Sequence, residues 1–398
     1  MISCLNRNEH SYSEKKVSSI ETEETNINAD EVLENVAYQL ELLVKVAETK
    51  NAIPRTIDKE GEIHWANPNF DWTEGFFSGS LWYLYKVTNE EKWKSAAEKF
   101  QTLFERHKYF TSNHDLGFIF NTSFANGYEL TKNNEFMDVM SVAADSLITR
   151  FNPNVGCIKS WDTDKGWQSK RDWKFPVIID NMMNLELLFK VSHLTKNKKY
   201  REIAIKHANT TLKNHFRDDN SSYHVVDYDS ETGEVRSKQT AQGFSNESAW
   251  ARGQAWGVYG YTVCYRYTKD SRYLKQAERI AKFILDNNHK NKDKLPFWDY
   301  NASQIPNEPV DVSAAAITAS ALIELDGYTS TSYRHYIDEI LNTLASDKYT
   351  AKIGQNQNFV LMHSVGSIPH GNEIDVPLNY ADYYYIEALV RYKNTYLK

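Results

Sequence analysis

The residues most able to do chemistry lie in the apolar stretch 175–184, where one carboxylate, Asp180, stands among large apolar side chains. These neighbours are Ile178, Ile179, Met182 and Met183. Pro176 suits a first helical turn, so the stretch predicts the start of a long helix. A carboxylate in apolar surroundings is costly unless it is paired or protonated, and its pKa rises towards neutrality. That is the property a general acid needs, although a helix-capping Asp is the common alternative.

A second carboxyl group, Asp115, follows His114 and precedes another apolar helical run. Its default interpretation is a helix N-cap. A third cluster begins at Trp72, which could stack on a sugar ring, and continues through Gly75 and Gly79. The two glycines indicate a close backbone approach, either to a ligand or simply to a neighbouring helix.

Ser248, Arg252 and Trp256 recur at intervals of four, which predicts that they share one face of a helix. The guanidinium of Arg252 offers a planar fork that matches a carboxylate, and Trp256 could stack over the same ligand. We therefore interpret this face as a binding surface for a small anionic molecule.

Two longer gaps between helical runs, 151–175 and 216–246, contain β-prone pieces and turn residues, and the second one holds His224, Thr240 and Gln242. Near the C-terminus, the loop 363–372 carries Ser367 among small polar residues and contains no Lys or Arg. It either shapes the site for a neighbouring sugar or is a plain surface loop.

Other site classes lack support. The histidines show no helix-spaced ligand pair, and neither a serine nucleophile elbow nor a phosphate loop occurs, so no metal or other cofactor is indicated. A formal charge of -7 argues against nucleic acid and anionic membrane surfaces as partners. Three cysteines form no disulfide framework, and no apolar run is long enough to span a bilayer.

The N-terminal residues 1–29 are polar and rich in Ser, Glu, Asn and Thr, which predicts a disordered leader before a single domain over 30–398. Cys4 near its start is either the lipid-anchor site of a lipoprotein or an incidental cysteine. The first alternative predicts a lipid-anchored or periplasmic protein without membrane insertion.

The rest of the chain reads as about twelve helical runs arranged in pairs. They are expected at 30–49, 74–87, 90–107, 115–131, 133–150, 177–195, 197–215, 247–268, 270–286, 311–326, 328–347 and 376–396. The turns share a pattern in which a threonine precedes an aromatic residue by five positions, as in Thr88 and Trp93 or Thr268 and Tyr273. An open stack would need polar capping repeats, whereas the last run is rich in tyrosine, so we expect an all-α closed ring of six inner and six outer helices.

At these residues the chain resembles glycoside hydrolase family 88, the unsaturated glucuronyl hydrolases, from about residue 30 to the C-terminus. The motifs that carry the resemblance are the stretches 72–76 (WTEGF), 114–118 (HDLGF), 179–184 (IDNMMN), 248–256 (SAWARGQAW) and 375–384 (DVPLNYADYY). The resemblance implies an (α/α)6 barrel, with Asp180 as general acid and base and Asp115 as an assisting carboxylate. It also implies that His114, His224, Thr240, Gln242, Arg252 and Trp256 line the sugar site.

The implied reaction removes a 4,5-unsaturated uronic acid from the non-reducing end of an oligosaccharide that a polysaccharide lyase has produced. Three alternatives remain: the sister family that acts on unsaturated rhamnogalacturonan, a conventional glycosidase using Asp115 and Asp180, and a non-catalytic glycan-binding protein.

Overall fold

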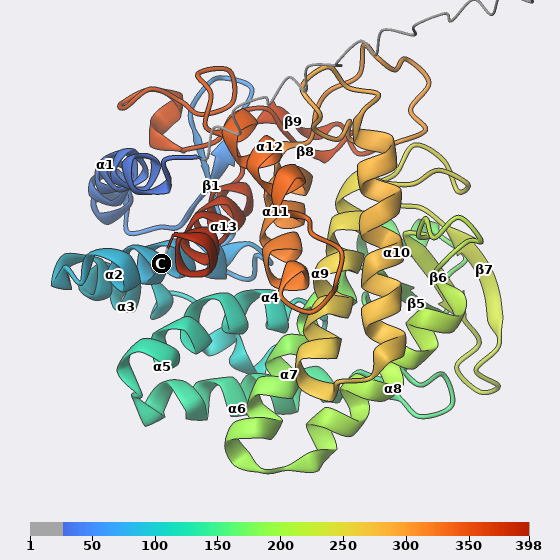
Figure 1. Cartoon of the computed structure of the whole chain (residues 1–398). Helices are drawn as coiled ribbons and strands as arrows, with labels where there is room; N and C mark the ends of the chain where they lie inside the picture. The colour runs from blue at the N-terminus through green and yellow to red at the C-terminus, as the bar shows by residue number, and fades with distance from the viewer. Residues whose placement is uncertain (1–26, 398) are drawn as a thin grey trace, which may run out of the picture.

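The computed structural model describes residues 27–397, in which helices form two concentric rings (Figure 1). The inner helices are α2 (Glu74–Thr88), α4 (Leu116–Phe120) with α5 (Asn126–Thr131), α7 (Asn181–Thr195), α9 (Ala251–Thr268), α11 (Val312–Asp326) and α13 (Asn379–Tyr396). Each inner element contacts the next, from α2 through α4, α7, α9, α11 and α13 back to α2, so the ring is closed. The predicted (α/α)6 barrel is therefore confirmed.

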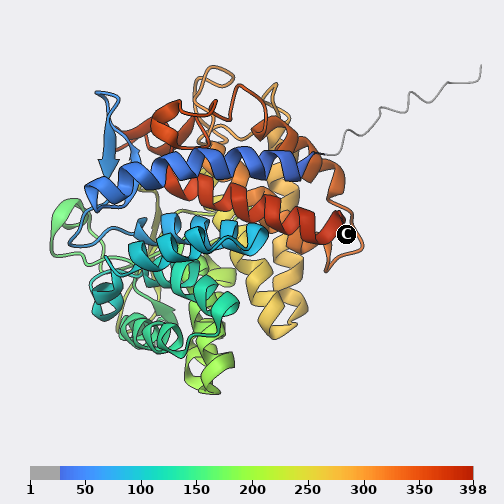
Figure 2. The ribbon, with the colours of Figure 1, turned by 90° about the vertical axis from the view of Figure 1, so that its left-hand side faces the viewer.

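The outer ring alternates with the inner one along the chain. Its helices are α1 (Ala29–Lys50), α3 (Glu91–Gln101), α6 (Asn134–Ile148), α8 (Lys198–Asn214), α10 (Ser271–Asn288) and α12 (Arg334–Leu344). Figure 2 shows how the ends of the chain meet: the first outer helix, α1, lies along the last inner helix, α13. Most predicted helical runs agree with these bounds to within a few residues, but α12 begins six residues later than predicted and α3 ends six residues earlier.

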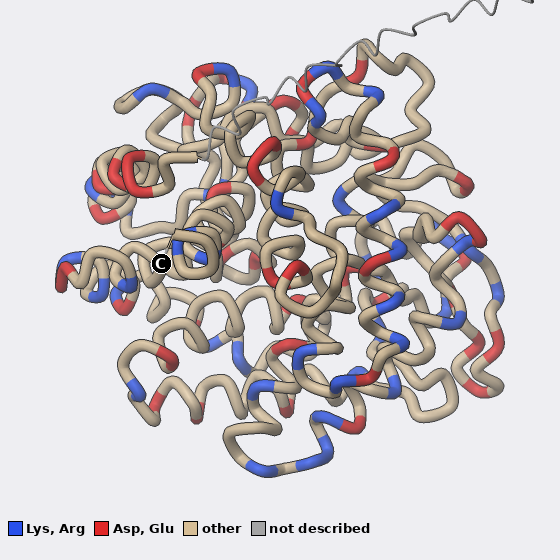
Figure 3. Tube along the Cα trace, in the orientation of Figure 1, with Lys and Arg blue, Asp and Glu red and all other residues tan. Residues whose placement is uncertain are grey.

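The position of each helix in the barrel is visible in its burial. In α11, almost every residue is buried, as expected for an inner helix packed on all sides. In α10, buried residues such as Tyr273, Ala277 and Ile284 follow a helical period while the rest of the helix is polar. Acidic and basic residues are interspersed over the trace (Figure 3), and no helix among residues 27–397 is long and apolar enough to cross a membrane.

Four of the helix-to-helix corners are built in the same way, which confirms the predicted repeat. At the first, Thr88 donates its hydroxyl to the carbonyl of Leu84 and accepts the N–H of Glu90, while Asn89 takes a left-handed φ of 56°. The aromatic residue five positions on, Trp93, is buried. Thr131, Thr195 and Thr268 make equivalent pairs of hydrogen bonds at the other three corners.

Short strands cover one end of the barrel. They are β1 (Pro54–Ile57) with β2 (Ile63–Trp65), β3 (Phe151–Asn152) with β4 (Cys157–Ile158), β5 (Phe175–Ile178) with β6 (Val225–Tyr228) and β7 (Val235–Gln239), and β8 (Ser364–Ser367) with β9 (Asn372–Val376). All of these pairings are antiparallel. Short 3-10 turns occupy Glu105–Tyr109, Gly166–Lys170 and Asn356–Asn358, and a π-helical turn, Asn121–Ala125, joins α4 to α5.

The predicted helix boundary next to Asp180 is also wrong. Pro176 lies in strand β5, opposite Asp227 of β6, and helix α7 begins only at Asn181. A short apolar run fits a buried strand as well as a helix start, and the strand prevails because β6 is available to pair with it. Asp180 consequently occupies the N-cap position, at the junction of strand and helix. The predicted leader and Cys4 lie outside the described residues, apart from 27–29, where Ile27 is buried and α1 begins.

Candidate active site

The predicted catalytic residues gather at the end of the barrel where the inner helices begin. Asp115 and Asp180 occupy the N-cap positions of α4 and α7, and Asp311 occupies that of α11. Only Asp311 uses its side chain as a cap, accepting the N–H of Ser313. The carboxyl groups of Asp115 and Asp180 make no such bond, so capping does not explain their presence.

Asp180 is a buried carboxyl group with few interactions that stabilise its negative charge. The residue is 9% exposed, and among the described residues its Oδ2 atom has no hydrogen-bond partner. Burial raises its pKa to about 7, an increase that the charge of Arg252 and a hydrogen bond from Trp256 only partly offset. Asp180 therefore carries a proton up to about neutral pH, as general acid catalysis requires.

His224 faces Asp180 in a fixed tautomer. Its Nδ1 atom accepts the backbone N–H groups of Ala241 and Gln242, both at 3.1 Å, so that nitrogen carries no proton. Burial pushes the pKa of His224 well below its ordinary value, so the ring is neutral with its proton on Nε2. That nitrogen lies 3.7 Å from Oδ2 of Asp180, which is beyond a direct hydrogen bond.

Asp115 is the second buried carboxyl group, at 7% exposure. Burial raises its pKa well above the ordinary value, and the negative charge of Asp180 raises it further. The charge of Arg150 opposes this shift, but that guanidinium is bonded to Asp162 and to backbone carbonyls. Asp115 and Asp180 thus disfavour each other's ionisation, and the pair titrates as a coupled unit.

Arg252 differs from its predicted role. Its guanidinium pairs with Asp311 at 3.0 Å and donates to the carbonyls of Val365 and Gly366, while it lies over the rings of Trp250 and Tyr380. The guanidinium of Arg252 is therefore bound to the carboxylate of Asp311, and not free to bind a ligand carboxylate as predicted. No sequence pattern links Arg252 to Asp311, because the two lie on different inner helices.

The shared helix face is also corrected. Ser248 precedes α9 and bonds to Asp299, so it is not on the helix. Trp256 is fully buried between Phe118 and Tyr384, with ring centroids at 5.0 Å and 5.4 Å. The prediction that Trp256 stacks over a ligand is therefore wrong, because its ring faces are covered by other aromatic side chains.

A pocket of about 330 Å³ opens over this end of the barrel. Its lining includes three predicted residues, Trp72, Gln242 and Ser367, together with Arg252. Asp115 and Asp180 are not part of this lining, but the charge of Arg252 acts on Asp180, and Trp72 contacts Phe118 of α4. The loop 363–372 thus shapes the pocket, as one of the two predicted alternatives proposed.

Comparison with known proteins places these features in a family. Residues 46–394 match Glycosyl Hydrolase Family 88. The chain belongs to glycosyl hydrolase family 88. It is 45% identical to an unsaturated glucuronyl hydrolase of Formosa agariphila over 352 residues, 87% of this chain and 86% of that protein. It is 30% identical to an unsaturated chondroitin disaccharide hydrolase of Streptococcus agalactiae, with 92% of each chain covered.

Solved structures agree. A crystal structure of an unsaturated glucuronyl hydrolase specific for heparin superposes with a TM-score of 0.87 at 42% identity, covering 92% of this chain and 97% of that one. The enzyme from Bacillus sp. GL1, described as responsible for glycosaminoglycan degradation, gives a TM-score of 0.83 at 28% identity, covering 91% and 96%. The present chain is therefore a glycosidase of the unsaturated glucuronyl hydrolase family, whose reaction removes an unsaturated uronic acid from oligosaccharides.

Three other predicted residues of this family 88 enzyme occupy different surroundings. His114 is completely buried behind Asp115, its Nε2 atom 3.3 Å from a carboxylate oxygen, so it does not line the pocket. Thr240 accepts the N–H of Gly243 and shapes the turn after β7, outside the pocket lining. Gly75 would place a Cβ atom 2.2 Å from the carbonyl oxygen of Ile119, so helix packing explains this glycine.

Four pocket residues were not predicted as part of the site. They are Arg55, Trp167, Glu373 and Tyr380, whereas His370 and Asn372 lie in the predicted loop 363–372. Trp167 lies 4.9 Å from the ring of His370 and packs with Trp161 and Trp173, so the density of tryptophan in the gap 151–175 was an available signal. Arg55 forms ion pairs with Asp71 and Glu373, which lie in other segments of the chain, so no local sequence pattern predicts these pairs.

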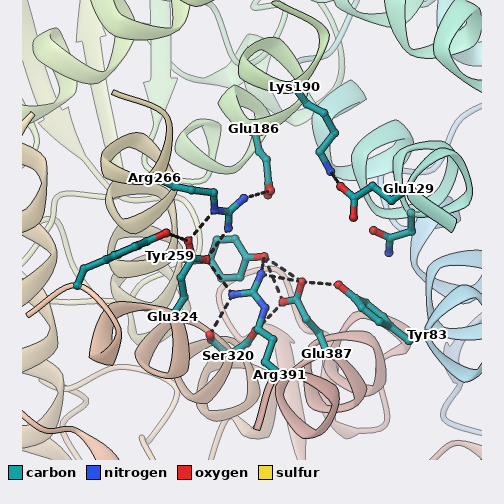
Figure 4. Close-up of polar contacts among 12 residues, drawn as sticks. Tyr83, Glu129, Glu186, Lys190, Tyr259, Arg266, Ser320, Glu324, Glu387 and Arg391 are labelled. Carbon is teal, nitrogen blue, oxygen red and sulfur yellow. Dashed lines mark hydrogen bonds and ion pairs between the residues drawn. The ribbon is translucent and has the colours of Figure 1, made fainter. Parts of the chain in front are cut away.

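The opposite end of the barrel holds a larger pocket, of about 400 Å³, where the inner helices finish. Figure 4 shows its charged side chains, which are paired with one another. Glu324 accepts from both Arg266 and Arg391, and Arg266 also reaches Glu186. Within residues 27–397, no group of three or more His, Cys, Asp or Glu side chains is arranged to hold a metal ion.

Proposed function

We propose that Asp180 is the general acid and Asp115 the assisting carboxylate in hydrolysis of a terminal 4,5-unsaturated uronic acid. The observation that carries this assignment is the burial of two carboxyl groups that begin neighbouring inner helices, close enough for the charge of Asp180 to act on Asp115, without a direct cationic partner. Burial raises the pKa values of both, that of Asp180 to about 7, so a carboxylic acid proton is available in the pair near neutral pH. Such a pair can donate a proton and afterwards accept one.

The substrate explains why one carbon, and not the glycosidic oxygen, receives the proton. The C4=C5 double bond is conjugated to the ring oxygen, so protonation at C4 produces an oxocarbenium-like centre at C5. Water adds there and loses a proton to the carboxylate, and the resulting hemiketal opens and expels the neighbouring sugar. Asp180 supplies the first proton, and Asp115 assists as the second carboxyl group of the pair.

The N-terminal ends of the inner helices favour binding of an anionic substrate. Six inner helices direct their N-terminal ends towards this mouth of the barrel, and the exposed N–H groups of such ends favour negative charge. This replaces the predicted role of Arg252, which contributes its charge to the pocket while it is bonded to Asp311.

We expect the residues at the rim of the pocket to contact the sugar next to the uronic acid. Ser367, His370 and Asn372 offer neutral polar groups there, and Arg55 is held between two carboxylates, Asp71 and Glu373. We therefore propose an uncharged neighbouring sugar, since sulfate would meet no free cation among these lining residues. A panel of lyase products, with and without sulfate, tests this preference through kcat/KM.

The decisive experiment is the Asp180→Asn variant in an absorbance assay that follows loss of the conjugated double bond. We expect the variant to fold normally and to lose roughly a thousandfold or more in kcat, the upper range of general acid-base effects. Turnover close to that of the unchanged enzyme would remove Asp180 from this role. Activity on saturated glycosides would favour a conventional glycosidase, and binding without turnover a glycan-binding protein.

Cellular location stays a prediction. A periplasmic enzyme, with or without a lipid on Cys4, would meet lyase products where they are imported. Fractionation of the host cells, combined with a Cys4→Ser variant, distinguishes an anchored from a free protein.

A further inference from the structure

Tyr380, in the first turn of α13, lines the pocket over the catalytic end of the barrel, and only 1% of it is exposed. Its ring packs against Trp72, with the ring centroids 4.9 Å apart. Its hydroxyl has no hydrogen-bond partner among residues 27–397. A buried polar group without a partner costs free energy, so the presence of a hydroxyl at this position needs an explanation.

The hydroxyl of Tyr380 lies among the charged groups of the pocket wall. The charges that act on it are those of Arg252, Glu373, Asp311 and Arg55, and all of these residues except Asp311 line the same pocket. The four charged groups are bonded to one another in two pairs, Arg252 with Asp311 and Arg55 with Glu373. The hydroxyl is therefore close to the pocket, and the protein leaves its bonding capacity unused.

The phenol of Tyr380 is a hydrogen-bond donor at working pH. Burial raises its pKa, and the positive charge of Arg252 only partly opposes this shift, so the group keeps its proton. The guanidinium carbon of Arg252 lies 5.4 Å from the centre of the phenol ring, and its charge favours a negatively charged acceptor nearby. On an unsaturated uronic acid the strongest acceptor is the carboxylate, because it is ionised at neutral pH.

We propose that the hydroxyl of Tyr380 donates a hydrogen bond to the carboxylate of the terminal unsaturated uronic acid. This assignment rests on the proposed function, because it requires a uronic acid in this pocket. The carboxylate is attached to C5, the atom that becomes positive during the reaction, and a donor draws negative charge away from it. The bond therefore contributes to substrate binding and does not accelerate the protonation step.

The first test is Tyr380→Phe, which removes the hydroxyl and keeps the ring. We expect KM for an unsaturated disaccharide to rise about tenfold to a hundredfold, the effect of losing a hydrogen bond to a charged group, while kcat stays within about threefold. Because the hydroxyl has no protein partner, the midpoint of chemical denaturation should not fall. An unchanged KM would overturn the proposal, whatever the midpoint.

Tyr385→Phe is the matched control. Tyr385 lies on the same helix and is also fully buried, and its hydroxyl also has no hydrogen-bond partner among residues 27–397. Five positions of a helix turn its side chain to another face, near Thr350 and outside the pocket lining. KM should stay within about twofold in this variant. A rise in KM equal to that of Tyr380→Phe would show a general effect on α13 and would contradict the specific role of Tyr380.

The second test identifies the acceptor by changing the substrate. The methyl ester of the same disaccharide has no carboxylate, so Tyr380→Phe should raise KM for the ester by no more than about threefold. The two changes would then be non-additive, as expected for groups that contact each other. An equal rise in KM for the acid and the ester would place the bond on another group of the sugar and would overturn the proposal.

The third test measures binding without turnover. Calorimetry with the disaccharide should show a Kd that is about tenfold to a hundredfold weaker in Asp180→Asn with Tyr380→Phe than in Asp180→Asn alone. If Asp180→Asn retained turnover while Tyr380→Phe raised KM for the acid alone, the proposed catalytic role would fail and the role of Tyr380 would stand. If Asp180→Asn abolished turnover while Tyr380→Phe changed neither KM nor Kd, the role of Tyr380 alone would fail.

Discussion

At the mouth where the inner helices begin, Asp180 is buried with only partial compensation, whereas at the opposite mouth Glu324 is held between Arg266 and Arg391. Burial raises the pKa of both carboxyl groups. At Asp180 that effect prevails and the pKa reaches about 7, but at Glu324 the two guanidinium charges more than offset it and the pKa falls to about 2. Burial alone therefore does not make an acid catalyst; burial away from a paired cation does.

The same contrast separates stability from function. Ion pairs at the mouth of Glu324 join α7, α9, α11 and α13, and each charge has a protein partner. The unpaired mouth keeps two carboxyl groups at a cost in folding free energy, which is characteristic of active sites. Neutralising Asp180 and neutralising Glu324 should consequently shift stability in opposite directions.

The largest effect on stability is expected from Arg252→Ala. It leaves Asp311 fully buried without its cation, and breaking a buried pair in this way costs about 4 kcal/mol. Chemical denaturation measures the loss. The double variant Arg252→Met with Asp311→Asn should recover much of it, because no charge then stays uncompensated. A variant of normal stability with only a raised KM would restore the original interpretation of Arg252 as a ligand for the substrate carboxylate.

Glu324→Gln should cost about 3 kcal/mol at neutral pH, because two guanidinium groups lose their shared anion. The folded-state pKa of Glu324 is lowered, so its contribution is present above about pH 4.5 and is lost as the pH falls towards 2. The stability difference should shrink over that range. A kcat within about twofold of that of the unaltered enzyme would show that Glu324 takes no part in catalysis. A large loss of kcat would contradict the assignment of a purely stabilising role to this end of the barrel.

Asp180→Asn should have the opposite sign, a gain on the order of 2 kcal/mol at pH 8. The folded-state pKa of Asp180 is raised to about 7, so the unaltered protein loses stability as the pH rises from about 4 to 7, and the neutral amide does not. Unfolding curves at pH 4 and pH 8 measure the difference. If the two proteins had equal stability at both pH values, ionisation of Asp180 would not cost folding free energy.

The helices and their corners could be predicted because their signals are local. Thr88 and its three counterparts bond within two to four residues, and the buried faces follow the helical period. The nearness of Asp115 to Asp180 was also predictable, since both precede inner helices of a closed ring. Local signals could not decide that Pro176 belongs to a strand, because β6 is distant in sequence.

The roles of Arg252 and Trp256 were mispredicted for a related reason. Residue type shows that a guanidinium can hold a carboxylate, but not whether that carboxylate belongs to a ligand or to Asp311. In the same way, an aromatic ring can stack on a sugar or be covered by Phe118. Whether a side chain is free to bind a ligand or is already bonded to other protein groups depends on the tertiary structure. For this reason the roles of both residues could be corrected only from the structure.

The central claim is that Asp180 holds a proton near neutral pH because it is buried without a paired cation. The most direct test is a titration of its carboxyl carbon in protein labelled with ¹³C at aspartate, with the signal identified by its loss in Asp180→Asn. We predict a midpoint near pH 7. A midpoint near pH 4, the value of an ordinary aspartate, would contradict the account.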